Sequence, residues 1–175
     1  PGREPEPFAP GLINVGVPVR DVAISPDGDE IYFGTEVGGF SFSTIMVTRR
    51  VGGVWTEPAP LPFMDTPGAM NMEPCLSPDG RRLFFFSTRP RAAGEEPGNQ
   101  DIWVMERASD SWGEPHNLGE PVCTDDSEYF PSVTRDGTIY FTTLTVTQDG
   151  GMLHAVTLTQ DPLKLTKKWA APFAG

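Results

Sequence analysis

The sequence feature that most constrains the fold is a turn motif that occurs three times. Ser25-Pro26-Asp27-Gly28 precedes the apolar run Ile31-Tyr32-Phe33, and Ser77-Pro78-Asp79-Gly80 precedes Leu83-Phe84-Phe85. A related segment, Thr134-Arg135-Asp136-Gly137, precedes Ile139-Tyr140-Phe141. The glycines at 28, 80 and 137 are 52 and 57 positions apart, a period typical of propeller blades and other repeat arrays.

A second motif repeats with nearly the same period. Trp-x-x-Pro occurs at Trp55, Trp112 and Trp169, and these residues are 57 positions apart. Two unrelated motifs with one period indicate a repeated structural unit rather than a chance match. A tryptophan that recurs in every unit is expected to pack one unit against the next, and Asp27, Asp79 and Asp136 are expected to bond within their own turns.

Each unit is predicted to contain four short antiparallel strands. Pro, Asp and Gly in the repeated turn suit a tight hairpin, and Leu83–Ser87 is so apolar that we expect it to be buried on both faces. No segment has a capped apolar period of 3.6 residues, so little or no helix is expected. The predicted strands are Asp21–Ile24, Glu30–Gly34, Ser43–Thr48 and Val54–Leu61, then Glu73–Ser77, Leu83–Ser87, Asp101–Glu106 and Trp112–Leu118, then Tyr129–Val133, Thr138–Thr142, Met152–Val156 and a last strand near Trp169.

Composition excludes several classes of function. The chain has 13 basic and 24 acidic residues, a net charge of −11, which argues against binding nucleic acid phosphates. It has no run of 18 apolar residues, so no membrane-spanning segment is predicted. The two cysteines do not form a disulfide framework. Cys75 alternates with apolar residues and is predicted to be a small buried thiol, and a bridge to Cys123 has no support in the sequence.

The units resemble the WD40-like (PD40) propeller repeat of TolB-type bacterial proteins. That repeat reads E-x-x-P-x-x-S-P-D-G-x-x-L-x-F-x-S, followed by D-I-W and then W-x-E-P-x-N-L-G. The third unit lacks the D-I-W element and has Gly151-Met152-Leu153-His154 in its place. In the second unit the matching residues are Glu73, Pro74, Ser77 to Gly80, Leu83, Phe85, Ser87, Arg89, Asp101 to Trp103, Trp112, Glu114, Pro115 and Asn117 to Gly119. In the other units they are Arg20, Asp21, Ser25 to Gly28, Tyr32 and Phe33, and Glu128, Pro131, Ser132, Asp136, Gly137, Tyr140 and Phe141.

The resemblance implies an all-β chain that forms part of a β-propeller. Three four-stranded blades are expected, at about residues 15–62, 63–121 and 122–175, in a single segment of a ring that has about six blades in the family. Three blades alone leave sheet edges and apolar faces open, so missing blades or self-association are expected to close the ring. The segment Phe8 to Asn14 is expected to be an outer strand of a further blade. The resemblance also implies a bacterial periplasmic or secreted setting and a protein or peptide partner, with a small ligand as an alternative.

Four residues are the candidate ligand- or partner-binding positions. Glu73 and Glu128 are expected to precede the first strands of their units and to lie at one end of the central channel. Arg89 and Arg91 begin a polar loop that runs to Gln100, and loops of this kind often carry function. The alternative is that Arg89 simply pairs with Asp101 or a neighbouring carboxylate.

No catalytic motif accompanies these residues. His116 and His154 are the two histidines, and neither lies in a G-x-S-x-G or H-E-x-x-H segment. The acidic clusters Asp27-Asp29-Glu30 and Asp125-Asp126-Glu128 do not have the spacing of a calcium loop, so no metal and no cofactor is predicted. The leading hypothesis is therefore a non-enzymatic binding scaffold. The alternative is a propeller-type hydrolase or lyase acting on carbohydrate or peptide, or the propeller of a larger peptidase.

Overall fold

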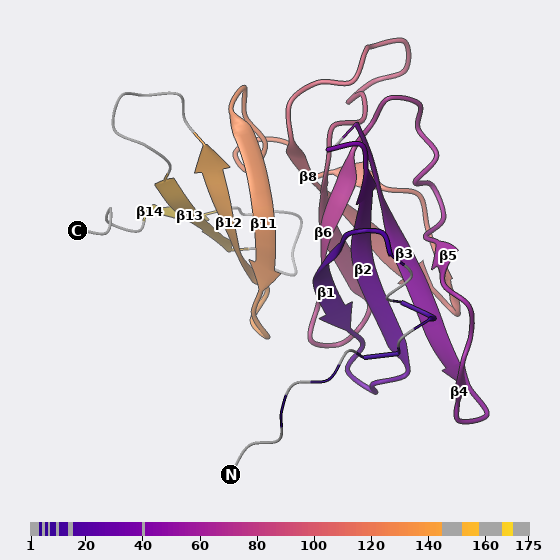
Figure 1. The fold of residues 1–175 in the computed structure, drawn as a ribbon. Helices are drawn as coiled ribbons and strands as arrows, with labels where there is room; N and C mark the ends of the chain where they lie inside the picture. The colour runs from indigo at the N-terminus through magenta and orange to yellow at the C-terminus, as the bar shows by residue number, and fades with distance from the viewer. Residues whose placement is uncertain are drawn as a thin grey trace.

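The chain folds into three antiparallel β-sheets that follow one another along the sequence (Figure 1). The computed structural model describes residues 4, 6, 8–9, 11–13, 16–39 and 41–144, and the backbone alone of 152–157 and 166–169. These residues include no helix, and hence none that is long and apolar enough to cross a membrane. The side chains of His154 and Trp169 lie outside the described part.

The fourteen strands divide into sheet 1 (β1–β5), sheet 2 (β6–β10) and sheet 3 (β11–β14). Their bounds are β1 Val19–Ile24, β2 Glu30–Val37, β3 Phe42–Val51, β4 Val54–Trp55, β5 Ala59–Pro60, β6 Asn71–Leu76, β7 Arg82–Ser87, β8 Asp101–Ala108, β9 Ser111–Trp112, β10 His116–Asn117, β11 Ser127–Val133, β12 Thr138–Leu144, β13 Met152–Thr157 and β14 Thr166–Trp169.

The predicted fourth strand of sheets 1 and 2 is broken into two short pieces. In sheet 1, β4 pairs with the end of β3 and β5 pairs with its middle, and β9 and β10 repeat this arrangement on β8. The residues between the pieces include Pro58 and Pro115, which have no backbone N–H to donate to a neighbouring strand. The Trp-x-x-Pro motif therefore interrupts the outer strand instead of continuing it.

Each sheet begins with a strand that is bulged at the same place. The backbone has positive φ at Asp21 (55°), Glu73 (60°) and Phe130 (53°), and the strand register shifts around each of them. Bulges of this kind bend a strand and increase its local twist. The three positions are 52 and 57 residues apart, as the turn glycines are, although their side chains differ. The repeat is therefore a property of the backbone as well as of the motifs.

The two repeat lengths differ because of one loop. The pairing of β1 with β2 and of β6 with β7 is offset by 52 residues, since Arg20 faces Gly34 and Met72 faces Phe86. The third strands are offset by 57 residues: Phe33 in β2 faces Met46 in β3, and the equivalent Phe85 in β7 faces Trp103 in β8. The five extra residues therefore lie between β7 and β8, in the loop that contains Arg89 and Arg91.

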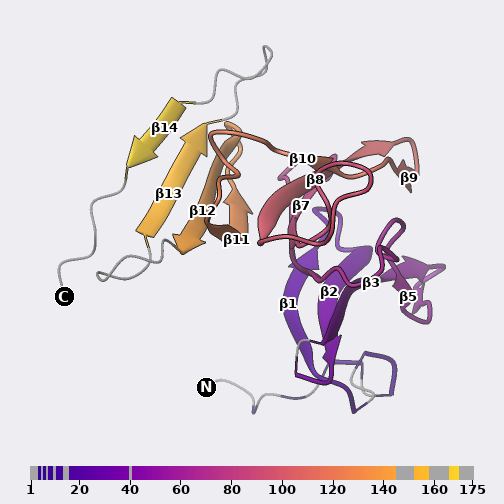
Figure 2. The same ribbon diagram turned by 90° about the horizontal axis from the view of Figure 1, so that it is seen from above.

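The sheets pack face to face in chain order, and their first strands, β1, β6 and β11, contact one another in turn where the sheets meet (Figure 2). Strand β7 is buried on both faces, as its sequence predicts. A small apolar cluster lies on the outer face of sheet 1, where Ile13 covers Ile31 and Phe33. The core between sheets 1 and 2 contains Tyr32, Ile45, Val47, Leu61, Met64, Leu83, Phe85, Trp103, Met105 and Trp112. The core between sheets 2 and 3 contains Met72, Phe84, Phe86, Ile102, Val122, Cys123, Ile139 and Phe141.

The expected outer strand at Phe8 to Asn14 is wrong for the residues that the structure describes there. Residues 11–13 form a turn, in which the N–H groups of Leu12 and Ile13 both donate to the carbonyl of Ala9. The turn places Ile13 on sheet 1, and the ring of Phe8 meets Trp55 edge-on at 6.2 Å. This segment covers an apolar face without adding a strand to it.

A polar joint ties sheet 1 to sheet 2 beside their shared core. The guanidinium of Arg107 donates to the carboxylate of Glu30 and to the hydroxyl of Tyr32, and lies over the ring of Trp112 at 4.5 Å. The indole N–H of Trp112 also donates to Tyr32, at 3.1 Å. Trp112 thus lies between two sheets as expected, and its polar end is satisfied in the core.

The repeated turns hold the hairpins closed through one carboxylate each. In sheet 2 the Ser77 hydroxyl donates to Asp79 and accepts the N–H of Arg82, and Asp79 also accepts the N–H of Arg81. The turn at Asp27 has the same bonds in the same order. The Ser77 hydroxyl and the Arg81 N–H hold the pKa of Asp79 below its ordinary value. The recurring aspartates therefore act within their own turns.

We expect Asp79→Ala to lower the free energy of unfolding by about 1 kcal/mol, because it removes two hydrogen bonds to a charged but solvent-screened carboxylate. Urea denaturation at pH 7 measures the change. The exposed Asp110→Ala is the control and should change stability little. Since the pKa of Asp79 is lowered in the folded state, the difference between wild type and variant should shrink as pH falls below 4. A difference that persists at pH 2 would contradict this account of the turn.

Candidate functional site

Three of the four candidate residues, Arg89, Arg91 and Glu128, gather at the end of sheet 2 that is opposite the repeated turns. Strand β7 ends there at Ser87, β8 begins at Asp101 directly opposite it, and the long loop joins them. The loop reaches the segment that leads to sheet 3, because the N–H of Glu128 donates to the carbonyl of Gln100 at 2.7 Å. We call this end of the molecule the loop face.

Arg89 is a buried cation that hydrogen-bonds to neutral groups. Its side chain is 7% exposed. Its Nε donates to the Ser87 hydroxyl at 3.0 Å, and its Nη2 donates to Oδ1 of Asn71 at 2.7 Å. The guanidinium carbon lies 5.3 Å from the ring centre of Phe85 and 5.2 Å from that of Trp103. Among the described residues, no carboxylate forms an ion pair with Arg89.

Arg91, and not Arg89, pairs with Asp101. Nε and Nη2 of Arg91 donate to the two oxygens of Asp101 at 2.6 and 2.7 Å, a bidentate arrangement. The same guanidinium donates to the carbonyl of Thr124, so it ties the long loop to the segment before β11. The side-chain amide of Asn117 donates to Asp101 as well, at 2.8 Å. The alternative interpretation, in which Arg89 pairs with Asp101 or a neighbouring carboxylate, is therefore wrong for the described residues.

Glu73 and Glu128 lie within the first strands, in β6 and β11, and not before them. They also occupy different positions of the repeat. Glu73 is four residues before Ser77 and corresponds to Phe130, whereas Glu128 is six residues before Thr134 and corresponds to Asn71. Matching the two glutamates as equivalents was wrong, because the E-x-x-P pattern fits only Glu128.

Glu73 lies at the junction of sheets 2 and 3. Its carboxylate accepts the N–H of Phe130 across the junction, so one bulge residue bonds to the backbone of the next. It lines a cavity of about 410 Å³ together with Arg20, Met72 and Tyr129. Burial raises the pKa of Glu73 to about 7, against the opposing effect of the Phe130 N–H.

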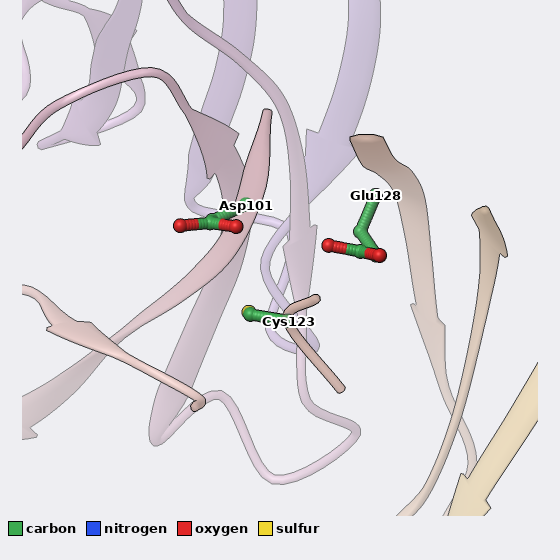
Figure 3. A group of neighbouring side chains, drawn as sticks. All are labelled: Asp101, Cys123 and Glu128. Atoms are coloured by element: carbon green, nitrogen blue, oxygen red, sulfur yellow. The ribbon is translucent and has the colours of Figure 1, made fainter. Parts of the chain in front are cut away.

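Glu128 forms a buried group with Asp101 and Cys123, drawn in Figure 3. Three segments supply these side chains: β8, the loop before β11, and β11. One oxygen of each carboxyl group and the sulfur of Cys123 lie within 4.8 Å of one another. All three side chains are 2% exposed or less. The group is a potential ligand set for a metal such as zinc, and its existing bonds decide whether it is available.

Those bonds engage every potential ligand atom of the group. Both oxygens of Asp101 are held by Arg91, and both oxygens of Glu128 accept bonds from Thr124, through its N–H at 3.1 Å and its hydroxyl at 2.7 Å. The Cys123 thiol contacts the carbonyl of Ile102 at 3.4 Å, and burial raises its pKa to about 12. A metal would have to displace the thiol proton as well as the bonds from Arg91 and Thr124. Arg91 already supplies the positive charge that a metal would bring, so we assign the group a structural role.

Cys75 and Cys123 are both free thiols, and Cys75 is only partly buried. Sequence reasoning singled out Arg89 and Arg91 through their place in a long loop. It missed the polar residues that receive them, Asn71, Thr124 and Asn117, because each comes from a different segment. The D-I-W element gave a signal for Asp101, but the spacing does not say which arginine it binds.

The sequence matches no model of a known protein family and no curated protein. The architecture and the contacts at the loop face are therefore the basis of the functional argument below.

We expect the protein to lose stability as pH rises from 4.5 to 7. Burial raises the pKa of Glu128 and of Glu73 from 4.5 to about 7, so the folded chain retains protons there that the unfolded chain releases. The negative charge of Asp101 raises the pKa of Glu128 further, and the positive charge of Arg91 lowers it. The loss should be on the order of 1–3 kcal/mol for wild type and smaller for Glu128→Gln, which cannot ionise.

Thermal melts from pH 4.5 to 8 measure this loss, with the exposed Glu57→Gln as the matched control. Glu57→Gln should follow the wild-type profile. A wild-type stability that rises steadily from pH 4.5 to 8, or a Glu128→Gln profile with the wild-type slope, would contradict the assignment.

Proposed function

We propose that this chain is a non-enzymatic binding scaffold built from propeller blades, and that its loop face engages a peptide, protein or small ligand. The observation that carries the proposal is the cavity at the loop face. It has a volume of about 400 Å³ and is lined by Phe63, Asp65, Arg89, Trp103, Glu114 and Pro115, among others. Volumes of 300–1,000 Å³ with aromatic walls and a few polar groups are typical of ligand sites.

Three features of the fold support the propeller interpretation. The same bulge, turn and interrupted outer strand recur in successive sheets. The sheets pack face to face in chain order, and their first strands lie on one side. The motifs resemble TolB-type repeats, which is the reason to propose a bacterial periplasmic or secreted setting and a protein or peptide partner.

The described side chains do not favour the enzyme alternative. The densest group of acid and thiol side chains, Asp101, Cys123 and Glu128, is buried and occupied by its own hydrogen bonds. A general acid or nucleophile has to reach its substrate, so this group has no access to one. His116 is exposed and lies on the short outer strand β10.

A ring of this kind also needs a neighbour for sheet 3. On β12, the side chain of Tyr140 alternates with the buried Ile139 and Phe141, so it points away from the core, and it is 41% exposed. We propose that further blades, or a second copy of the chain, cover this face.

Sedimentation tests the second copy. It should detect a dimer that Tyr140→Lys disrupts and that the control Arg135→Glu preserves. A wild-type monomer would rule out the second copy and leave further blades as the proposed cover.

A phage-displayed random peptide library tests the binding function. We expect selected peptides to lose at least tenfold in affinity for Phe63→Ala, which removes an aromatic wall of the cavity, and to keep it for Arg81→Gln at the opposite end. Peptides that bind both variants equally well would place the binding surface elsewhere. Turnover of ester, amide or glycoside substrates by the purified protein would favour the enzyme instead.

A further inference from the structure

The loop-face cavity contains a cationic donor, Arg89, that forms no ion pair with any carboxylate in the described part of the chain. Two of the three guanidinium nitrogens of Arg89 have partners, and all of these partners are uncharged. Nη1 has no hydrogen-bond partner among the described residues. Because it is absent from the fully buried atoms without a partner, it keeps some accessible surface. Nη1 is therefore the part of this cation that remains open to the cavity that Arg89 lines.

Burial of the Arg89 charge is energetically unfavourable in this arrangement. Burying a charge without a counter-ion is strongly unfavourable, and burial lowers the pKa of Arg89 to about 10. Contacts with the faces of Phe85 and Trp103 recover part of that cost. An anionic ligand at Nη1 would recover more.

A second donor, close to the cavity but beneath its surface, also lacks a partner. Trp103 lines the cavity and is 5% exposed, and its buried indole N–H has no acceptor among the described residues. Buried donors are almost always bonded in folded proteins, so each exception needs a reason. The indole nitrogen is itself fully buried, so the N–H can report on the cavity beside it but is not exposed to a ligand there.

The backbone at the mouth of the cavity is strained. Phe63 has a φ of 63°, which bulky side chains rarely adopt, and its ring is 39% exposed. Strain of this kind is concentrated at binding and catalytic sites. Here it holds an aromatic ring at the edge of a pocket instead of turning it into the core.

The charges around the cavity restrict the ligand. Asp65 and Glu114 are exposed and line the same cavity, and Asp65 acts electrostatically on Arg89. Arg91 also lines the cavity, but its charge is already paired with Asp101. Two exposed carboxylates beside the one unpaired guanidinium disfavour a dianion such as phosphate, as does the net charge of −11. They suit a ligand that carries an ammonium group together with its carboxylate.

We propose that the loop-face cavity binds a small zwitterion of the amino-acid class, with its carboxylate at Nη1 of Arg89, its ammonium group toward Asp65 and Glu114, and an apolar side chain against Phe63. This deepens the proposed function and rests on it, since it names the ligand class of the same cavity.

Three related compounds separate the two charges. L-Phenylalanine has both, L-phenylalaninamide lacks the carboxylate, and 3-phenylpropionate lacks the amine. Binding is followed by NMR through the indole N–H signal of Trp103, which Trp103→Phe identifies. We expect L-phenylalanine to shift this signal saturably, and each of the other compounds to bind at least tenfold more weakly.

Two variants test the assigned partners. Arg89→Gln should abolish the response to L-phenylalanine, and the exposed Arg81→Gln should leave it unchanged. Because Arg89 is buried, its variant is first checked for a folded amide spectrum. Asp65→Asn, which changes an exposed residue, provides the second test: it should weaken L-phenylalanine several-fold and leave 3-phenylpropionate unaffected.

The proposal is overturned if all three compounds shift the signal equally, or if none does so up to about 10 mM. It is also overturned if Asp65→Asn weakens 3-phenylpropionate as much as L-phenylalanine. These failures are distinct from failure of the proposed function. Library peptides that still depend on Phe63 would preserve the binding scaffold and exclude only the zwitterion.

Discussion

The structure depends on the middle sheet, whose strand β7 is buried on both faces. Leu83 and Phe85 of β7 point into the core shared with sheet 1, and Phe84 and Phe86 point into the core shared with sheet 3. All four are 5% exposed or less. Each contributes about 1.5–3 kcal/mol through burial of apolar surface. Ile102 and Met105 of the neighbouring β8 add to the same two cores, so the middle sheet joins the other two. The hydrogen bonds of Arg107 stabilise the junction of sheets 1 and 2 in addition.

The same strand positions the candidate binding site. The chain leaves β7 at Ser87, whose hydroxyl accepts a bond from Nε of Arg89 two residues later. The rings that flank the guanidinium belong to Phe85 on β7 and Trp103 on β8, which face each other in the register. A rigid, doubly covered sheet thus fixes the direction of the arginine, while the long loop supplies part of the cavity wall. Such preorganisation reduces the ordering cost of binding.

Sequence reasoning anticipated the antiparallel strands, the absence of helix in the described residues and the burial of β7, because motif period and apolar pattern are local signals. It did not anticipate the break in the outer strand, although Pro58 and Pro115 are visible in the sequence. The bulges were also missed, because Asp21, Glu73 and Phe130 share a backbone conformation but no side-chain property. At the site, the choice of Arg91 over Arg89 as the partner of Asp101 depends on loop geometry that spacing does not encode.

Amide hydrogen exchange tests the central claim most directly, since it reports which strands open only on global unfolding. If the double burial of β7 holds the molecule together, the amides of Leu83 to Phe86 should be the slowest to exchange, with protection that equals the global stability. Strands β2 and β12, each in an outer sheet, should open earlier. Exchange in β7 that is as fast as in β12 would contradict the account, because the middle sheet would then open together with an outer one.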